Sequence, residues 1–509
     1  RMKHLLTIIL SLACVGAWAQ GTDLGRLGRN LRLDIESTTN VGGGNFAPMW
    51  LSSNRHGLAS VRPTWNYERV ALHRDMADDS LRNWRMGYGA DVAVMFGGER
   101  TFCLQELFAE FAWKKIYITL GSKKQPLSLD RNESLTSGGL AYGINARPIP
   151  QVRVGVDWCT FTRGGWKIKG HLSYGWKTDG PWQRAHLDDN GLLNQPLGNS
   201  RRTEGTLYHE KALYFRFGRR DKFPLEGEIG LQWATEFGGK SFRIYGRGWT
   251  LSQTVDGVAL PSGFTAYKNA LFVLGNDITD GNINNSEGNH LGSWVAALTW
   301  HGRDWKVKAY MERYFEDISQ LGLTYGISDH LLGLEVELPA NPFLSNLVFE
   351  HMNSRNQTGA VYHDYSPNIP DKMNGRDNYY NHNIYTGWQN YGMSMGTPLL
   401  TSPLYNKAFG QGGAIKCVNN RVRAWHVGLS GNPFTGFDWR LLMTFSRNWG
   451  TYDDPFDDPM DQTYLMVEAG YAPPTWKGWS GRLALGIDRG DMIGNNTGCQ
   501  ITIAKRFRF

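Results

Sequence analysis

Aromatic and amide-bearing residues are concentrated in the segment 376–393. This combination suits sugar binding, because an aromatic ring can cover the apolar C–H face of a sugar while polar side chains hydrogen-bond its hydroxyl groups. A structural loop that carries interfacial aromatic residues is the alternative interpretation. The residues that we predict to contact a saccharide are Arg376, Tyr379, Tyr380, His382, Tyr385, Trp388 and Tyr391.

Motifs for catalysis and for cofactor binding are not found in the sequence. It contains no G-x-S-x-G elbow, no G-x-G-x-x-G, no phosphate-binding loop and no H-E-x-x-H zinc motif. The acidic run from Asp453 to Asp461 lacks the spacing of a calcium loop and contains prolines, so a solvated turn is the favoured interpretation. We therefore predict a non-enzyme without catalytic residues, metal or cofactor.

Two arginines, Arg147 and Arg153, lie around a pair of prolines in the segment 145–153. They could hold an acidic polymer. They could also pair with Glu106 and Glu110, which alternate with apolar residues in 105–114 and are expected to point into a wet interior. We favour this pairing, which predicts that the four residues line a polar lumen.

Strands are the elements that must position these residues. Apolar and polar side chains alternate along several stretches, which places each kind on its own face of a strand. A soluble β-sandwich alternates as well, but many of these runs continue for about ten residues, against about 5–6 in globular proteins, and aromatic residues often lie at their ends. The clearest runs are 105–114, 166–177, 228–237, 438–446 and 482–488.

Composition favours one large barrel over several packed domains. The chain of 509 residues contains 61 Gly, 20 Trp, 22 Tyr and 23 Phe, and only 20% of its residues are charged. We predict an all-β fold: a closed antiparallel transmembrane β-barrel of about 18 strands that forms a single domain over 20–509. Long polar segments interrupt the alternation and are expected to be extracellular loops or inward plugs, namely about 123–150, 178–205, 239–290, 352–418 and 450–461.

Both ends of the chain indicate export to the outer membrane of a Gram-negative bacterium. Residues 1–19 have a basic start, an apolar core and the A-x-A sequence of a signal peptide cleaved after Ala19. The last residues alternate between apolar and polar and end at Phe509, an aromatic terminus that barrel assembly machinery reads. Expected partners are this machinery and the outer-membrane lipid, including LPS.

Charge and cysteine content exclude other classes of protein. The net charge of +7 is dispersed along the chain, so nucleic-acid binding is not expected. Four cysteines of the mature chain show no C-x-x-C spacing, and therefore predict neither a zinc nor a redox motif. One disulfide among them remains possible; they are Cys103, Cys159, Cys417 and Cys499.

Several segments resemble the capsule assembly Wzi family. They include FAPMWLSSNRHGL at 46–58, NARPIPQVRVG at 145–155, KGHLSYG at 169–175 and GWQNYG at 387–392. The resemblance implies an outer-membrane barrel, which has eighteen strands in the enterobacterial members. Those members act as lectins that help hold capsular polysaccharide at the cell surface. Those members also carry a helical bundle near the N-terminus, whereas 21–60 of this chain predicts strand and Gly-rich turn.

These observations lead to one principal functional hypothesis. We predict a non-enzymatic outer-membrane barrel that binds surface polysaccharide and helps assemble or retain capsule or exopolysaccharide. A passive, porin-like channel is one alternative. A structural subunit of a larger outer-membrane complex, with a further protein partner, is another.

Overall fold

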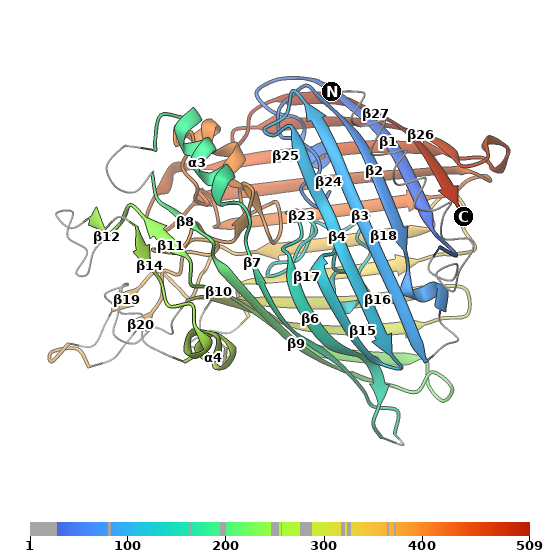
Figure 1. Ribbon diagram of the computed structural model, residues 1–509, viewed down its shortest axis with the longest axis horizontal. Coiled ribbons are helices and arrows are strands. Elements are labelled where there is room, and N and C mark those ends of the chain that lie inside the picture. The colour runs from blue at the N-terminus through green and yellow to red at the C-terminus, as the bar shows by residue number, and fades with distance from the viewer. Residues whose placement is uncertain are drawn as a thin grey trace.

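A single closed barrel dominates the computed structural model of the protein (Figure 1). The structure describes residues 28–79, 83–162, 164–193, 200–245, 254–255, 257–274, 288–316, 321–322, 327–363, 366–370 and 373–509. The predicted signal peptide lies outside the described residues. Among these residues, no helix is both long and apolar enough to cross a membrane.

Eighteen strands of the described chain form one antiparallel sheet. Neighbours in the sequence pair with each other, and β1 pairs with β27 from Arg32↔Arg508 to Gly43↔Thr497, which closes the barrel and leaves no exposed sheet edge. The strands are β1 (Arg32–Gly43), β2 (Trp65–Arg74), β3 (Trp84–Phe96), β4 (Phe102–Trp113), β5 (Ile116–Ser122), β6 (Gln151–Thr160), β7 (Lys167–Trp176), β9 (Leu207–Phe217), β10 (Leu225–Phe237), β15 (Asn289–His301), β16 (Lys306–Phe315), β17 (His330–Glu337), β18 (Asn346–Asn353), β23 (Val422–Gly431), β24 (Phe437–Gly450), β25 (Pro455–Tyr471), β26 (Trp479–Gly490) and β27 (Asn496–Arg508).

Alternating side chains produce an apolar outer surface and a polar interior. On β27, Ile501 and Ile503 are 52% and 54% exposed, whereas Gln500, which directly precedes Ile501, is buried. On β4, Leu107 and Phe111 point outward, and the glutamates of the same strand point inward. The apolar band is the surface that lipid requires, so the predicted transmembrane β-barrel is confirmed.

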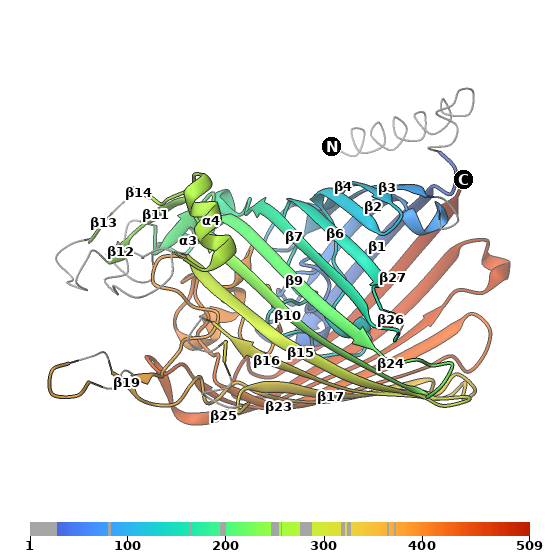
Figure 2. The ribbon, with the colours of Figure 1, turned by 90° about the horizontal axis from the view of Figure 1, so that it is seen from below.

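The two ends of the barrel differ in their connections (Figure 2). The longest ones all lie at one end, here the long-loop end. The opposite, short-turn end holds brief turns, the start of β1 and the end of β27. The long connections are 44–64, 123–150, 177–206, 238–288, 316–329 and 354–421.

One predicted loop is wrong. Most of the segment 450–461 belongs to β25, which begins at Pro455 and pairs with Gly450 across a bulge. β25 extends 17 residues, and its first residues are exposed on both faces, because here the strand projects beyond the apolar band. Without an apolar face, this part of a strand has the composition of a loop.

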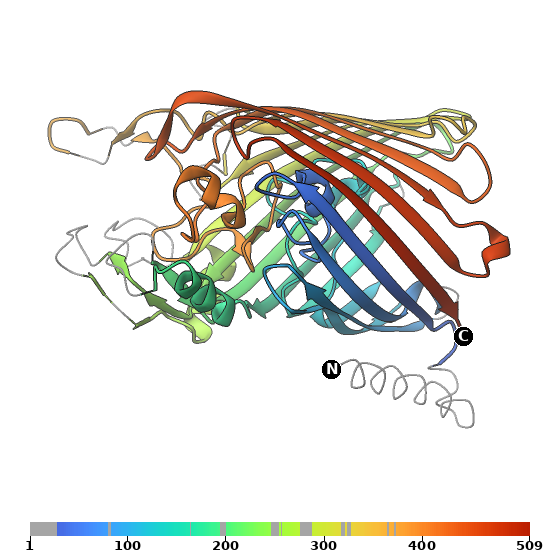
Figure 3. The same ribbon diagram turned by 90° about the horizontal axis from the view of Figure 1, so that it is seen from above.

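Small elements decorate the long-loop end. Helix α3 (Gly180–Asp189) lies beside the 3₁₀ helix η6 (Pro403–Phe409), as Figures 1 and 3 both show. Helix α4 (Phe264–Phe272) packs on the outside of β9 and β10, and the Lys211 ammonium of β9 donates to Ala270 O at its C-terminal end. The remaining short elements are α2 (Met49–Ser52), η3 (Met76–Asp79), η4 (Ser128–Asp130), η7 (Pro474–Trp476), β8 (Arg202–Glu204), β11 (Lys240–Phe242), β12 (Ile244–Tyr245), β13 (Thr254–Val255), β14 (Val258–Ala259), β19 (Tyr362–His363), β20 (Met373–Asn374), β21 (Gln389–Asn390) and β22 (Met393–Ser394).

Three segments, 44–64, 123–150 and 375–421, fold into the lumen and are here called the plug (Figure 3). One buried cluster joins their apolar residues to inward side chains of the strands, with Trp50, Leu135 and Trp388 among the members. Strand and Gly-rich turn are predicted near the N-terminus in place of a helical bundle. The described residues 28–60 agree, because their helical content is the single turn α2.

Inward carboxylates of the barrel hold the plug in place. An irregular segment leaves backbone N–H groups without partners, and a carboxylate is a strong acceptor for them. Glu350 accepts from Ser137 N at 2.7 Å, Glu312 from Ala141 N at 2.9 Å and Asp488 from Met49 N at 3.0 Å. The polar lumen wall is therefore the binding surface for the plug.

Candidate functional site

Four of the predicted saccharide contacts are core residues of the plug. The exposed fractions of Tyr379, Tyr380, Tyr385 and Trp388 lie between 1% and 4%. Tyr379 donates its hydroxyl to Asp329 at 3.0 Å, and the Trp388 indole donates to the Ala141 carbonyl at 2.7 Å. Saccharide contact does not fit this burial, because none of these rings offers a face to a ligand.

The other predicted contacts lie nearer the surface. Arg376 is exposed and pairs with Asp453 of the β24–β25 turn at 3.3 Å. His382 is half-buried, and its Nδ1 accepts from the backbone N–H of Ile384 at 3.1 Å. Tyr391 is half-buried and has an accessible hydroxyl at the long-loop end.

Tyr391 occupies the tip of a two-residue hairpin between β21 and β22. Tyr391 and Gly392 have φ values of 53° and 81°, which is the requirement of a type I′ turn. Such turns favour Asn-Gly, since the left-handed region costs an ordinary side chain about 1–2 kcal/mol. The chain thus carries a large ring where the backbone disfavours it, which points to a role for the ring itself.

Two residues of α3 complete a surface cluster with this ring. Trp182 stacks on His186 with 4.9 Å between ring centroids, and its centroid lies 6.5 Å from that of Tyr391. All three rings are half-buried. Gly392 permits this approach, because a Cβ there would lie 2.6 Å from the Trp182 ring. We call Trp182, His186, Tyr391 and Arg147 the aromatic platform.

Sequence reasoning placed Trp182 and His186 in a loop and missed them. Asp179-Gly-Pro181 ahead of Trp182 is a helix start, with proline at the first turn. Residues four apart on a helix face the same side, so Trp182 and His186 could have been recognised as neighbours. Their proximity to Tyr391, which is distant in the sequence, could not.

Arg147 stacks beneath the Tyr391 ring, with 3.8 Å between its guanidinium carbon and the ring centroid. Burial lowers the pKa of Arg147, and the nearby Arg100 lowers it further. Its Nε and Nη2 are buried and have no hydrogen-bond partner among the described residues. Because both atoms are buried, the guanidinium supports the Tyr391 ring from below through a cation–π contact and does not itself face a ligand.

The predicted pairing of the arginines with Glu106 and Glu110 is wrong. Arg153 pairs with Glu210 of β9 at 2.7 Å. Glu106 pairs with Lys124 at 3.2 Å, and Glu110 pairs with Lys123. The glutamates do face the lumen, but the lysines of 123–124 reach them first, because this segment turns inward directly after β5.

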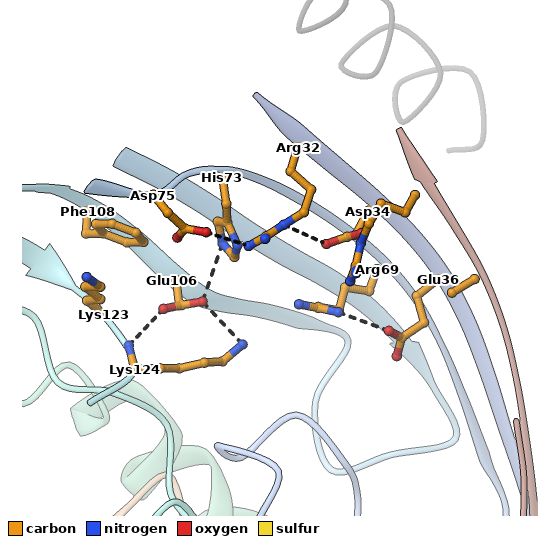
Figure 4. A pocket seen from close by; sticks show the side chains of 12 residues that line it. Arg32, Asp34, Glu36, Arg69, His73, Asp75, Glu106, Phe108, Lys123 and Lys124 are labelled. Atoms are coloured by element: carbon orange, nitrogen blue, oxygen red, sulfur yellow. Dashed lines mark hydrogen bonds and ion pairs between the residues drawn. The ribbon is translucent and has the colours of Figure 1, made fainter. Parts of the chain in front are cut away.

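Glu106 borders a cavity of about 380 Å³ close to the short-turn end (Figure 4). Acidic and basic side chains of β1, β2, β4 and β27 alternate around it. His73, Asp91 and Glu106 bring potential metal-ligand atoms within 4.8 Å of one another. The Lys124 ammonium lies 3.1 Å from Asp91 and 3.2 Å from Glu106, so an internal cation already meets this charge.

The four cysteines within the described residues are not paired with each other. Cys103, Cys159, Cys417 and Cys499 all have free thiols. Cys103 and Cys417 are buried, where a thiol packs as a small apolar group.

Comparisons with known proteins support the fold. No family model and no curated protein matches the sequence. Among solved structures, the chain is similar to Wzi of Escherichia coli, described as an outer-membrane protein involved in group 1 capsule assembly and a carbohydrate-binding β-barrel. The TM-score is 0.54 and the identity 11%, over 96% of this chain and 86% of that one.

OprD and OccK9 of Pseudomonas aeruginosa are also similar, with TM-scores of 0.42 and 0.45 and identities of 7% and 8%. Each alignment covers 94% of this chain, and 95% of OprD or 98% of OccK9. The fold is that of outer-membrane β-barrel proteins. Membership of the Wzi family remains a prediction, because similarity at this level of identity shows the fold alone.

Proposed function

We propose that this chain is a non-enzymatic outer-membrane protein of a Gram-negative bacterium that binds surface polysaccharide at its long-loop end. There it helps assemble or retain capsule or exopolysaccharide, as a member of the Wzi family. The observation that carries the proposal is the aromatic platform, in which the half-buried rings of Trp182 and Tyr391 lie together at the long-loop end above the buried Arg147 guanidinium.

The chemistry of the platform matches that of a sugar chain. The Trp182 and Tyr391 rings supply apolar faces for C–H groups, while the Tyr391 hydroxyl, which donates to the Thr178 carbonyl, can accept a hydrogen bond from a sugar hydroxyl. The similarity of the fold to a barrel described as carbohydrate-binding agrees with this proposal. The predicted contacts Arg376 and His382 are retained as outlying parts of the same polymer-binding surface.

The plug argues against the alternative of a passive channel. One buried cluster connects all three plug segments with the barrel wall, so the long-loop half of the lumen is packed. An open pore would require the plug to leave. A structural subunit of a larger complex remains the third possibility, and it predicts a bound protein partner without glycan binding.

The test is polysaccharide binding by the purified, detergent-solubilised barrel, with surface polysaccharide from its own strain immobilised on a sensor. The variant Tyr391→Asn removes the ring and keeps a residue that the turn favours. The matched control is Phe456→Ala, which removes a half-buried ring stacked on Phe409 outside the platform. We expect Tyr391→Asn to bind the polysaccharide at least tenfold more weakly than the wild type, and Phe456→Ala to bind it as tightly as the wild type. Absence of binding by the wild-type barrel would overturn the proposal.

A further inference from the structure

Arginines gather on the outside of the barrel at the long-loop end. Arg355, Arg421, Arg423 and Arg447 are here called the outer arginine patch. Arg423 of β23 and Arg447 of β24 are direct cross-strand partners. Arg421 donates its Nε to the Arg355 carbonyl at 3.2 Å, which places these two residues side by side in the next rung.

The alternation of β23 and β24 shows that the patch faces outward. Val422 and Ala424, on either side of Arg423, are buried in the barrel. Trp425 shares the outward face of Arg423 and is 46% exposed, and its partner Phe445 is 47% exposed. The patch therefore lies directly above the apolar band, one rung from side chains that face lipid.

Nothing in the described protein neutralises most of this charge. Two like charges directly opposite on neighbouring strands destabilise a sheet. Among the described residues, one carboxylate pairs with the patch: Asp461 lies 3.7 Å from Arg447, and both side chains are more than half exposed. An exposed pair of this kind contributes little. Arg355, Arg421 and Arg423 have no ion pair with a described residue.

Aromatic rings hold two of the guanidinium groups in place. Arg355 stacks on Trp449 at 4.6 Å, and Arg421 stacks on Tyr452 at 3.9 Å. Stacking occupies the flat face of a guanidinium and leaves the N–H donors at its edge for a ligand. Those edges match the geometry of phosphate, which arginine binds through two parallel hydrogen bonds.

We propose that the outer arginine patch binds the phosphate groups of a phosphorylated glycolipid in the outer leaflet of the membrane. A phosphorylated disaccharide headgroup lies at the height of the patch when its acyl chains lie against Trp425, Phe445 and Phe349 below. The bound phosphates neutralise Arg423 and Arg447, which otherwise repel each other. This lipid site is separate from the aromatic platform and does not depend on the proposed function.

The test uses the full barrel, stripped of lipid in detergent and examined by native mass spectrometry. The probe is purified bisphosphorylated lipid A, compared with its monophosphorylated form, with phosphatidylethanolamine and with inorganic phosphate. The variant is Arg423→Gln/Arg447→Gln. The matched control is Arg219→Gln/Arg220→Gln, which removes two exposed arginines from the short-turn end.

We expect the wild-type barrel and the control to retain lipid A and the patch variant to bind it at least tenfold more weakly. The monophosphorylated form is expected to bind less tightly than the bisphosphorylated one, and inorganic phosphate to compete only at millimolar concentration. Arg423→Lys/Arg447→Lys keeps the charge without the paired donors, so intermediate binding is expected.

Equal binding of lipid A by the wild type and the patch variant would overturn the proposal. Equal binding of phosphatidylethanolamine and lipid A, or equal binding of the two forms of lipid A, would overturn it as well. Heat-modifiable mobility on a gel verifies that each variant is a folded barrel. A variant that fails this check is replaced by the single change Arg423→Gln, for which at least threefold weaker binding is expected and unchanged binding counts against the proposal.

Discussion

Replacing Glu350 by alanine should release the plug. Glu350 is 1% exposed and accepts hydrogen bonds from Thr136 Oγ1, Ser137 N, Ser137 Oγ and the Tyr310 hydroxyl at 2.6–2.7 Å. Hydrogen bonds to a charged group contribute about 1.5–3 kcal/mol each and are not additive, so we expect a loss of about 4 kcal/mol. Because 1.4 kcal/mol is a factor of ten, this raises the equilibrium constant for plug release roughly 700-fold.

The assay is single-channel conductance in planar bilayers. The wild-type barrel should be closed or nearly closed, and Glu350→Ala should show frequent openings. Glu350→Gln retains one acceptor oxygen and should lie between them. Glu337→Ala is the control, because this glutamate pairs with Lys306 at the short-turn end of β17 and does not touch the plug. A Glu350→Ala barrel that is as quiet as the wild type would refute the role given to the inward carboxylates.

Three further predictions concern the plug and the platform. Burial lowers the pKa of His56 to about 3, so the docked plug favours the neutral imidazole. Plug docking should therefore be strongest above pH 6.5 and should weaken as the pH falls from 6.5 to 3, by at most about 5 kcal/mol. Conductance that does not change with pH over this range, or that stays equally pH-dependent in His56→Asn, would count against this prediction. Gly392→Ala should weaken polysaccharide binding at unchanged barrel folding, measured on the sensor and by gel mobility, because the new Cβ meets Trp182 and the backbone has positive φ. Burial raises the pKa of the Cys417 thiol to about 12, so maleimide should leave Cys417 unlabelled in the wild type and label it in Glu350→Ala, as peptide mass spectrometry would show.

The strands could be predicted because their signal is local. Alternation along 105–114 or 482–488 follows from the pleat itself, whatever the rest of the chain does. The same reasoning failed at the start of β25, where the strand leaves the membrane and loses its apolar face. The number of strands followed from the count of candidate strands and from the even number that is usual in bacterial single-chain barrels.

The site could be predicted only in part, because residue type does not determine direction in a loop. Trp388 and Tyr391 lie three residues apart, yet the first ring is buried in the plug and the second lies at a hairpin tip. Their difference depends on which loop folds into the lumen, a property of the whole barrel. Trp182 joins Tyr391 from a different loop for the same reason.

The central claim is that surface polysaccharide binds at the aromatic platform, and hydroxyl-radical footprinting of the detergent-solubilised barrel tests it most directly. With saturating polysaccharide from its own strain, oxidation of Trp182 and Tyr391 should fall at least threefold, while Phe456 and the lipid-facing Trp425 should be oxidised as before. Bound polysaccharide that leaves Trp182 and Tyr391 fully reactive would contradict the account.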